Sequence, residues 1–172
     1  MARRFRQWPS VAVTLFAAIL SAVAVRSWWD SRAGTSAVSL APGTAEILGV
    51  IDGNTLLVAQ GQPGLRSHAT TAPVEYRVRL LGVEVASPQE PAAAAHLAAI
   101  APPGPARIEL DKRRIAADGS WLAYVYVGQT LVNAQLIARG QARYEAYPGD
   151  SQPIGRQLRQ AQQSAARAGR GP

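Results

Sequence analysis

AEILGVIDGNTLLVA, residues 45–59, carries the strongest structural signal in this chain. Two apolar runs, residues 45–51 and residues 55–59, flank the tripeptide Asp52-Gly53-Asn54. Each run has the length of a short strand, and the tripeptide is rich in turn-forming residues. An Asp-Gly step between two such runs is a strong signal for a β-hairpin. The sequence therefore predicts a strand, a tight turn centred on Gly53, and a second strand.

Further strands and helices are predicted on the C-terminal side of this hairpin. Residues 60–73 show no periodicity and predict a long loop, after which EYRVRLL at residues 75–81 alternates like a half-buried strand. Five short strands, with helices after the third and the fifth, are compatible with a curled antiparallel barrel and with an open α+β sheet. The predicted strands cover residues 45–51, 55–59, 75–81, 107–110 and 121–127, and the predicted helices cover residues 91–100, 131–139 and 154–168.

Composition limits the class of protein. The chain has 172 residues, of which 48% are hydrophobic, and it has two His and no Cys. This length allows one domain with appendages, and the composition excludes a disulfide framework and makes structural zinc very unlikely. The formal charge of +7 lies in the two ends, since residues 1–29 and residues 154–172 each hold four Arg and no acid. A near-neutral middle does not favour nucleic acid as a partner.

The N-terminus predicts export from the cytoplasm. Arg3, Arg4 and Arg6 precede the uncharged stretch of residues 11–25, which is the pattern of an export signal. Residues 8–29 would span about 33 Å as a helix, enough for a membrane anchor. Ala22-Val23-Ala24 also fits a signal peptidase, so both an uncleaved anchor and cleavage after Ala24 stay open.

Both alternatives place the remaining chain outside the cytoplasm. An anchor would hold the domain on the periplasmic or extracellular side of a bacterial-type inner membrane, whereas cleavage would release it as a secreted protein. The predicted organisation is a signal-anchor or signal peptide, a linker, a folded domain and a flexible tail, which cover residues 1–29, 30–44, 45–168 and 169–172.

The order and spacing of several segments resemble the staphylococcal nuclease (thermonuclease-like) family. The similarity runs from about Glu46 to Ala168, and it implies an OB-fold five-stranded barrel with about three helices. It also implies one bound Ca²⁺ and hydrolysis of phosphodiesters in DNA or RNA. The segments that carry it are VIDGNT at residues 50–55, VRLLGVE at residues 78–84, LAYVY at residues 122–126, VNAQL at residues 132–136 and GQAR at residues 140–143.

The resemblance assigns roles to four residues. Asp52, Asn54 and Glu84 take the positions of metal ligands, although the family has Asp at the last two positions. Arg79 takes the position of an arginine that contacts phosphate, and Glu84 would act beside it in the catalytic site. Because Asn54 brings no charge, we expect weaker binding of Ca²⁺. We also expect Arg79 to pair with Glu84 or Asp52, and Asp52 to serve the hairpin turn.

Two further functions of the family's site lack an obvious residue in this chain. When this chain is aligned with the family pattern without a gap, the position of the general base falls on Ser87. When Pro88 is aligned with the proline of the pattern, the position falls on Gln89. Only a further shift of the alignment brings Glu90 to it. The position of the second arginine falls on Ser120. Arg113 or Arg114 could replace that arginine from the nearby turn, where a solvated basic turn is the simpler expectation.

The remaining candidate residues are expected to have no catalytic role. His68 and His96 have no partners at ligand spacing. The arginines of the last predicted helix form a solvated face, with contact to nucleic acid or to anionic lipid headgroups as the alternative.

These observations favour a barrel that has kept its fold and lost most of its catalysis, and that acts as a binding or interaction module without a cofactor. The missing groups are important for the rate of hydrolysis. A phosphate-contacting arginine contributes roughly 10³–10⁵ in rate in other phosphoryl-transfer enzymes, and a general base contributes roughly 10²–10⁴. The alternative is a Ca²⁺-dependent DNA or RNA endonuclease with a rearranged site. The expected partners are the membrane, through residues 8–29, and an unidentified protein.

Overall fold

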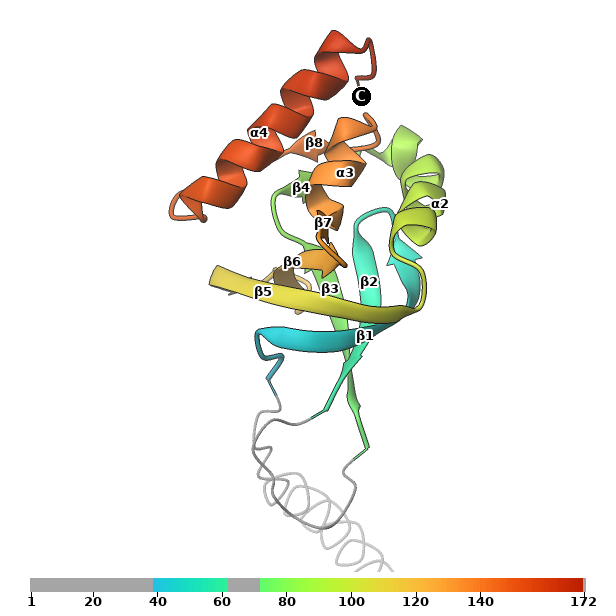
Figure 1. Ribbon diagram of the computed structural model, residues 1–172, viewed down its shortest axis with the longest axis vertical. Helices are drawn as coiled ribbons and strands as arrows, with labels where there is room; N and C mark the ends of the chain where they lie inside the picture. Colours follow the sequence, from blue (N-terminus) through green and yellow to red (C-terminus); the bar gives the residue numbers. More distant parts are fainter. Residues whose placement is uncertain (1–38, 62–71, 172) are drawn as a thin grey trace, which may run out of the picture. The chain divides into compact units, whose positions relative to one another are not determined.

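The computed structural model describes residues 39–61 and 72–171 (Figure 1). The stretch Ser39–Pro172 forms one compact unit. The helix predicted at residues 8–29 lies outside the described residues. Within the part of the chain that the structure does describe, no helix is both long enough and apolar enough to cross a membrane.

Five strands close into an OB-like barrel. They are β1 (Gly43–Asp52), β2 (Thr55–Gln60), β3 (Val74–Leu80), β5 (Gly104–Ile115) and β6 (Trp121–Val127). The hydrogen-bonded order is β3-β2-β1-β5-β6, and a parallel pairing of β3 with β6 closes the barrel. The five predicted strands are confirmed, and the chain forms the barrel and not the open sheet. Figure 1 shows the long strands β1 and β5 crossing one side of it.

Helices and short strands surround one end of the barrel. The helices α2 (Glu90–Ile100), α3 (Val132–Ala138) and α4 (Gln152–Arg167) confirm the three predicted helices. A 3₁₀ turn, Ser87–Gln89, precedes α2. The short strands β4 (Val83–Glu84) and β8 (Arg143–Tyr144) pair with each other, and β7 (Thr130–Leu131) pairs with β6. Helix α3 therefore begins one residue later than predicted, because Leu131 belongs to a strand.

The barrel core follows from the alternation of side chains along each strand. In β3, Tyr76, Val78 and Leu80 are buried inside the barrel, whereas Glu75 and Arg77 are exposed. Successive side chains of a strand point to opposite faces, so this pattern requires one apolar face and one polar face. The outward face of β3 is the one that carries Arg79.

The buried amide of Asn133 links α3 to the barrel by hydrogen bonds, in addition to the apolar side chains that α3 buries. Asn133 is fully buried. Its Nδ2 donates to the carbonyl oxygens of Leu81, at 2.9 Å, and Ala123, at 3.2 Å, and its Oδ1 accepts from the Val125 N–H at 3.0 Å. These bonds fix the segment that leads from β3 to β4, which contributes to the candidate site.

The folded part begins before the predicted hairpin. Leu40 is buried, and the buried side chain of Gln60 bonds to the backbone of the segment that leads into β1. Its Oε1 accepts from the Ala41 N–H at 2.8 Å, and its Nε2 donates to the carbonyls of Ala41 and Thr44 at 2.9 and 3.2 Å. The last residues of the stretch assigned to the linker, 30–44, thus pack against the barrel.

Candidate functional site

A pocket of about 680 Å³ opens at the end of the barrel where β1 turns into β2. Segments from most of the chain meet there, because the hairpin turn, the end of β3, the start of α2 and the end of β5 lie around the same opening. The lining residues are Asp52, Asn54, Arg79, Leu80, Gly82, Val83, Glu84, Val85, Glu90, Arg113, Ala116, Ala117, Leu122, Glu145 and Tyr147. All four residues that the sequence assigns to the site, Asp52, Asn54, Arg79 and Glu84, are among them.

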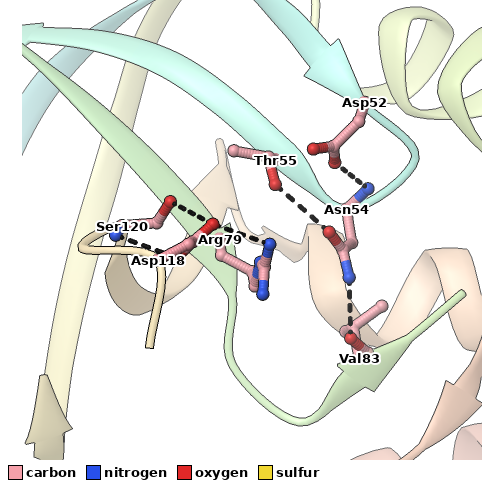
Figure 2. A network of polar contacts seen from close by, with 7 residues as sticks. All are labelled: Asp52, Asn54, Thr55, Arg79, Val83, Asp118 and Ser120. Atoms are coloured by element: carbon pink, nitrogen blue, oxygen red, sulfur yellow. Dashed lines mark hydrogen bonds and ion pairs between the residues drawn. The ribbon is translucent and has the colours of Figure 1, made fainter. Parts of the chain in front are cut away.

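The hairpin turn uses its polar side chains for its own structure (Figure 2). The carboxylate of Asp52 accepts from the Asn54 N–H at 3.0 Å, which closes the turn. The amide of Asn54 donates to the Val83 carbonyl at 3.1 Å and accepts from the Thr55 hydroxyl at 3.2 Å. Both ends of the Asn54 side chain therefore have partners within the protein, and the amide ties the turn to β4.

Arg79 pairs with Asp118, so the expectation of Glu84 or Asp52 as its partner is wrong. One guanidinium nitrogen lies 2.9 Å from the Asp118 carboxylate (Figure 2). The parallel pairing of β3 with β6 sets Arg79 opposite Leu122, and this register brings the turn before β6 beside the arginine. The carboxylate of Asp118 also accepts from the N–H and the hydroxyl of Ser120, both at 3.1 Å.

Ser120 therefore supports the partner of Arg79 and supplies no positive charge of its own. It is nearly fully buried. Its backbone N–H is the main cause that lowers the pKa of Asp118, and its hydroxyl and the charges of Arg79 and Arg77 act in the same direction. Asp118 thus stays ionised beside Arg79 across the physiological pH range.

Glu84 also has a partner within the protein. Its carboxylate lies 3.1 Å from the guanidinium of Arg143, because the antiparallel pairing of β4 with β8 sets the two residues opposite each other. Both side chains are about half exposed, at 49% and 54%. Exposed ion pairs of this kind contribute about 0–1 kcal/mol, so a ligand can displace the partner at little cost.

Glu90 is the carboxylate that α2 adds to the pocket. It is the first residue of that helix, and its carboxylate accepts from the Gly53 N–H of the hairpin turn. The family resemblance places Ser87 or Gln89 at the position of the general base, but neither residue lines the pocket. A signal for Glu90 exists in the sequence, since an acid directly before Pro91 is typical of the first turn of a helix.

Arg113 is the second guanidinium of the pocket. It comes from the end of β5, and its Cζ lies 3.3 Å from the centroid of the Tyr147 ring, so the two side chains stack. Its Nε is buried and has no hydrogen-bond acceptor among the described residues, as is the case for the Nε of Arg79. Arg114 is exposed and does not line the pocket. The structure therefore separates two arginines that the sequence left equivalent.

The one histidine that the structure describes does not line this pocket. His96 lies on α2 and is absent from the lining residues, and burial together with the charge of Arg139 lowers its pKa. His68 lies outside the described residues.

One family model matches part of the chain. The model of the family described as Staphylococcal nuclease homologue matches residues 104–171, from the start of β5 to just past the end of α4. The matched range holds β5 and β6 of the closed five-stranded barrel, and β1, β2 and β3 precede it. The chain contains a staphylococcal nuclease-like domain. No curated protein matches the chain. The matched range includes Arg113 and Asp118, while the hairpin turn of the nuclease-like domain and its Glu84 precede it.

The charges that line the pocket of the nuclease-like domain leave an excess of two negative charges. Four carboxylates and two guanidinium groups line it. The carboxylates belong to Asp52, Glu84, Glu90 and Glu145.

Ca²⁺ does not fit the donors in the arrangement found here. Domains of the staphylococcal nuclease family are generally Ca²⁺-dependent. Among the described residues of this nuclease-like domain, however, no three His, Asp or Glu side chains are grouped so that they could hold a metal ion. The Asn54 amide is bonded at both ends, and Glu84 is paired with Arg143. A calcium site would require these side chains to leave their partners.

Proposed function

We propose that this chain is an exported staphylococcal nuclease-like domain that binds a ligand at the barrel-end pocket and hydrolyses phosphodiesters weakly or not at all. The observation that supports this proposal is the ion pair between Arg79 and Asp118. The one arginine that the family resemblance assigns to phosphate has a carboxylate of the protein as its partner.

The chemistry of hydrolysis explains the importance of that pair. Negative charge builds on a phosphodiester as water attacks it, so the site must hold positive charge where the phosphoryl oxygens will lie. In this pocket the carboxylates outnumber the guanidinium groups by four to two, before Asp118 is considered. A ligand of low negative charge, such as a protein segment or an oligosaccharide, suits this balance better than a nucleic acid.

The export part of the proposal rests on residues 1–29. The basic start and the apolar stretch of residues 11–25 support a membrane anchor or a signal peptide that takes the domain outside the cytoplasm. The mass of the mature protein, purified from membranes and from medium, tests it. An intact N-terminus in membranes supports the anchor, and a start at Val25 in the medium supports cleavage after Ala24. Protein found only in the cytoplasm contradicts export.

A second candidate function is a Ca²⁺-dependent phosphodiesterase with a rearranged site. Two observations favour it: Glu90 and Arg113 both line the pocket. Glu90 brings a carboxylate to the opening, where the family resemblance placed Ser87 or Gln89 as the general base. Arg113 brings a guanidinium, where the resemblance placed Ser120 as the second arginine. The Gly53 N–H occupies one oxygen of the Glu90 carboxylate, so the other oxygen would be the one to accept a proton from water.

A degradation assay separates the two functions. The full chain, in an uncharged detergent, is incubated with single-stranded and double-stranded DNA and with RNA, with Ca²⁺ or with a chelator. The proposed function predicts little cleavage under all conditions. Rapid cleavage that needs Ca²⁺ would support the second candidate if Arg79→Ala, Glu90→Gln and Arg113→Gln each reduce it and Arg114→Gln does not. The last substitution is the matched control, because it removes the same charge from a neighbouring position outside the pocket.

A further inference from the structure

A second cavity lies between α3 and α4, and it shares no residue with the barrel-end pocket. Its volume is about 630 Å³. We call it the α3/α4 groove. It is lined by Ala134, Gln135, Ala138, Arg139, Gln157, Gln160, Ala161, Ser164 and Arg170. Three of the lining residues are alanines, and the others carry hydrogen-bond donors, of which the Ser164 hydroxyl already donates to the Gln160 carbonyl at 2.9 Å.

The charge of the α3/α4 groove is opposite to that of the barrel-end pocket. Its two charged lining residues are Arg139 and Arg170, and no carboxylate lines it. Neither arginine takes part in an ion pair among the residues that the structure describes. The whole of α4 contains Arg156, Arg159 and Arg167 and no acid. The positive charge at the groove therefore has no partner within the described protein.

Backbone contacts between the end of α3 and the last described residues keep Arg139 and Arg170 at the groove. Gly140 follows α3 with a φ of +73°, and a Cβ placed on it would lie 3.0 Å from the backbone carbonyl carbon of Arg170. The absence of that atom lets the last residues pack against the end of α3. The Arg170 N–H also donates to the Ala165 carbonyl at 2.9 Å. Arg170 is thereby seated beside Arg139 by its backbone.

The helix dipole explains only part of this arrangement. Cations near the C-terminal end of a helix are favoured by the partial negative charge there, which accounts for Arg139 after α3 and for Arg167 in the last turn of α4. Arg167, however, does not line the groove. The dipole gives no reason for Gln135, Gln157 and Gln160 to face the same cavity as Arg139 and Arg170.

We propose that the α3/α4 groove binds a phosphate group. Arg139 and Arg170 would supply charge-assisted hydrogen bonds, and the glutamine amides would supply neutral donors to the remaining oxygens. The site is independent of the barrel-end pocket and of any hydrolysis there. The phosphate belongs either to a small soluble compound or to the headgroup of an anionic phospholipid.

The absence of Cys from the chain allows a specific measurement. Gln163 is exposed on α4 and does not line the groove, so Gln163→Cys accepts one environment-sensitive fluorophore beside the site. The labelled full chain is titrated with inorganic pyrophosphate in an uncharged detergent. In a second arm it is reconstituted into vesicles of phosphatidylcholine, alone or mixed with phosphatidylglycerol.

The substitutions Arg139→Gln and Arg170→Gln test the groove, and Arg156→Gln and Arg167→Gln are the controls. Each control removes an equal charge from α4 at a position that does not line the groove. We expect each groove substitution to weaken binding roughly tenfold, since one hydrogen bond to a charged group is lost, and each control to change it less than about twofold.

The two arms identify the source of the phosphate. Saturable binding of pyrophosphate that the groove substitutions weaken supports a soluble phosphate compound. A response confined to vesicles that contain phosphatidylglycerol, weakened by the same substitutions, supports a lipid headgroup. The proposal is overturned by no saturable response in either arm, or by equal weakening in Arg156→Gln and Arg139→Gln.

Discussion

The guanidinium of Arg79 lies 2.9 Å from the carboxylate of Asp118, a residue 39 positions later in the chain. The contact exists because β3 and β6 run parallel and close the barrel, which places the turn before β6 beside the end of β3. The pair is partly exposed, with 36% and 38% of the two side chains accessible. The pair occupies the arginine that the family resemblance assigns to phosphate.

Replacement of Asp118 should release Arg79. Asp118→Asn keeps an amide that can bond with Ser120 and removes the carboxylate beside the guanidinium. We expect the barrel-end pocket to bind a short oligonucleotide more tightly, while the thermal midpoint changes little, because exposed ion pairs contribute little to stability. Fluorescence anisotropy at low salt measures the affinity. The gain should disappear in the double variant Asp118→Asn, Arg79→Ala, and a gain that persists there would show that Arg79 is not the group released.

Asn54→Asp tests why the pocket does not fit Ca²⁺. An aspartate cannot donate to the Val83 carbonyl, which Asn54 Nδ2 approaches at 3.1 Å, so two oxygens would face each other. We expect a loss of roughly 1–3 kcal/mol in the free energy of unfolding without metal. Ca²⁺ should recover part of this loss, since the new carboxylate adds to those of Asp52 and Glu84.

Thermal unfolding with and without Ca²⁺ measures this effect. Asn54→Ala is the control, because it also loses the hydrogen bond to the Val83 carbonyl but gains no carboxylate, so Ca²⁺ should leave its thermal midpoint unchanged. Equal stabilisation of the unsubstituted chain and of Asn54→Asp by Ca²⁺ would contradict the conclusion that the present arrangement does not fit the ion.

Asn133→Ala should be one of the more damaging single substitutions in the domain. It leaves the buried N–H of Val125 without its partner, and it removes the Asn133 amide from the carbonyls of Leu81 and Ala123, of which Ala123 keeps the Leu81 N–H at 2.9 Å. Unsatisfied buried groups cost roughly 1–3 kcal/mol each, and we expect a total loss near the upper end of that range. Urea unfolding followed by tryptophan fluorescence measures it. Gln135→Ala, on an exposed position of the same helix, should change the stability by less than about 0.5 kcal/mol.

The stability of the domain should depend on pH through Asp150. Burial raises the pKa of Asp150, against the opposing effects of the Tyr147 N–H and the charge of Arg113. A carboxyl whose pKa is raised on folding stabilises the fold while it is protonated, below its ordinary pKa of about 3.9, and this contribution is lost as the pH rises through the raised value. Asp150→Asn removes the burial of the charge and keeps an acceptor for the Tyr147 N–H.

We therefore expect Asp150→Asn to have a higher thermal midpoint than the unsubstituted chain at neutral pH. The difference should shrink as the pH falls toward about 4, where the carboxyl of the unsubstituted chain becomes protonated. Scanning calorimetry across this range measures both midpoints. A difference that stays constant with pH would exclude titration of Asp150 as the cause.

The elements of this protein could be predicted because their signals are local. The Asp-Gly step at residues 52–53 specifies a turn, the alternation at residues 75–81 specifies a strand with one buried face, and the order of the segments after Glu46 resembles that of a nuclease barrel. Each signal depends on side chains within a few positions of one another, so the predicted strands and helices begin and end within two residues of their observed bounds, apart from β5, whose ends extend further.

The composition of the site depends on closure of the barrel. The sequence suggested Glu84 or Asp52 as the partner of Arg79, whereas the parallel register of β3 with β6 places Asp118 beside it. The start of α2 brings Glu90 to the turn in place of Ser87 or Gln89, and the end of β5 directs Arg113 toward the pocket and leaves Arg114 exposed. These choices join residues that are tens of positions apart in the chain, and the packing of the closed barrel is the physical cause that selects them.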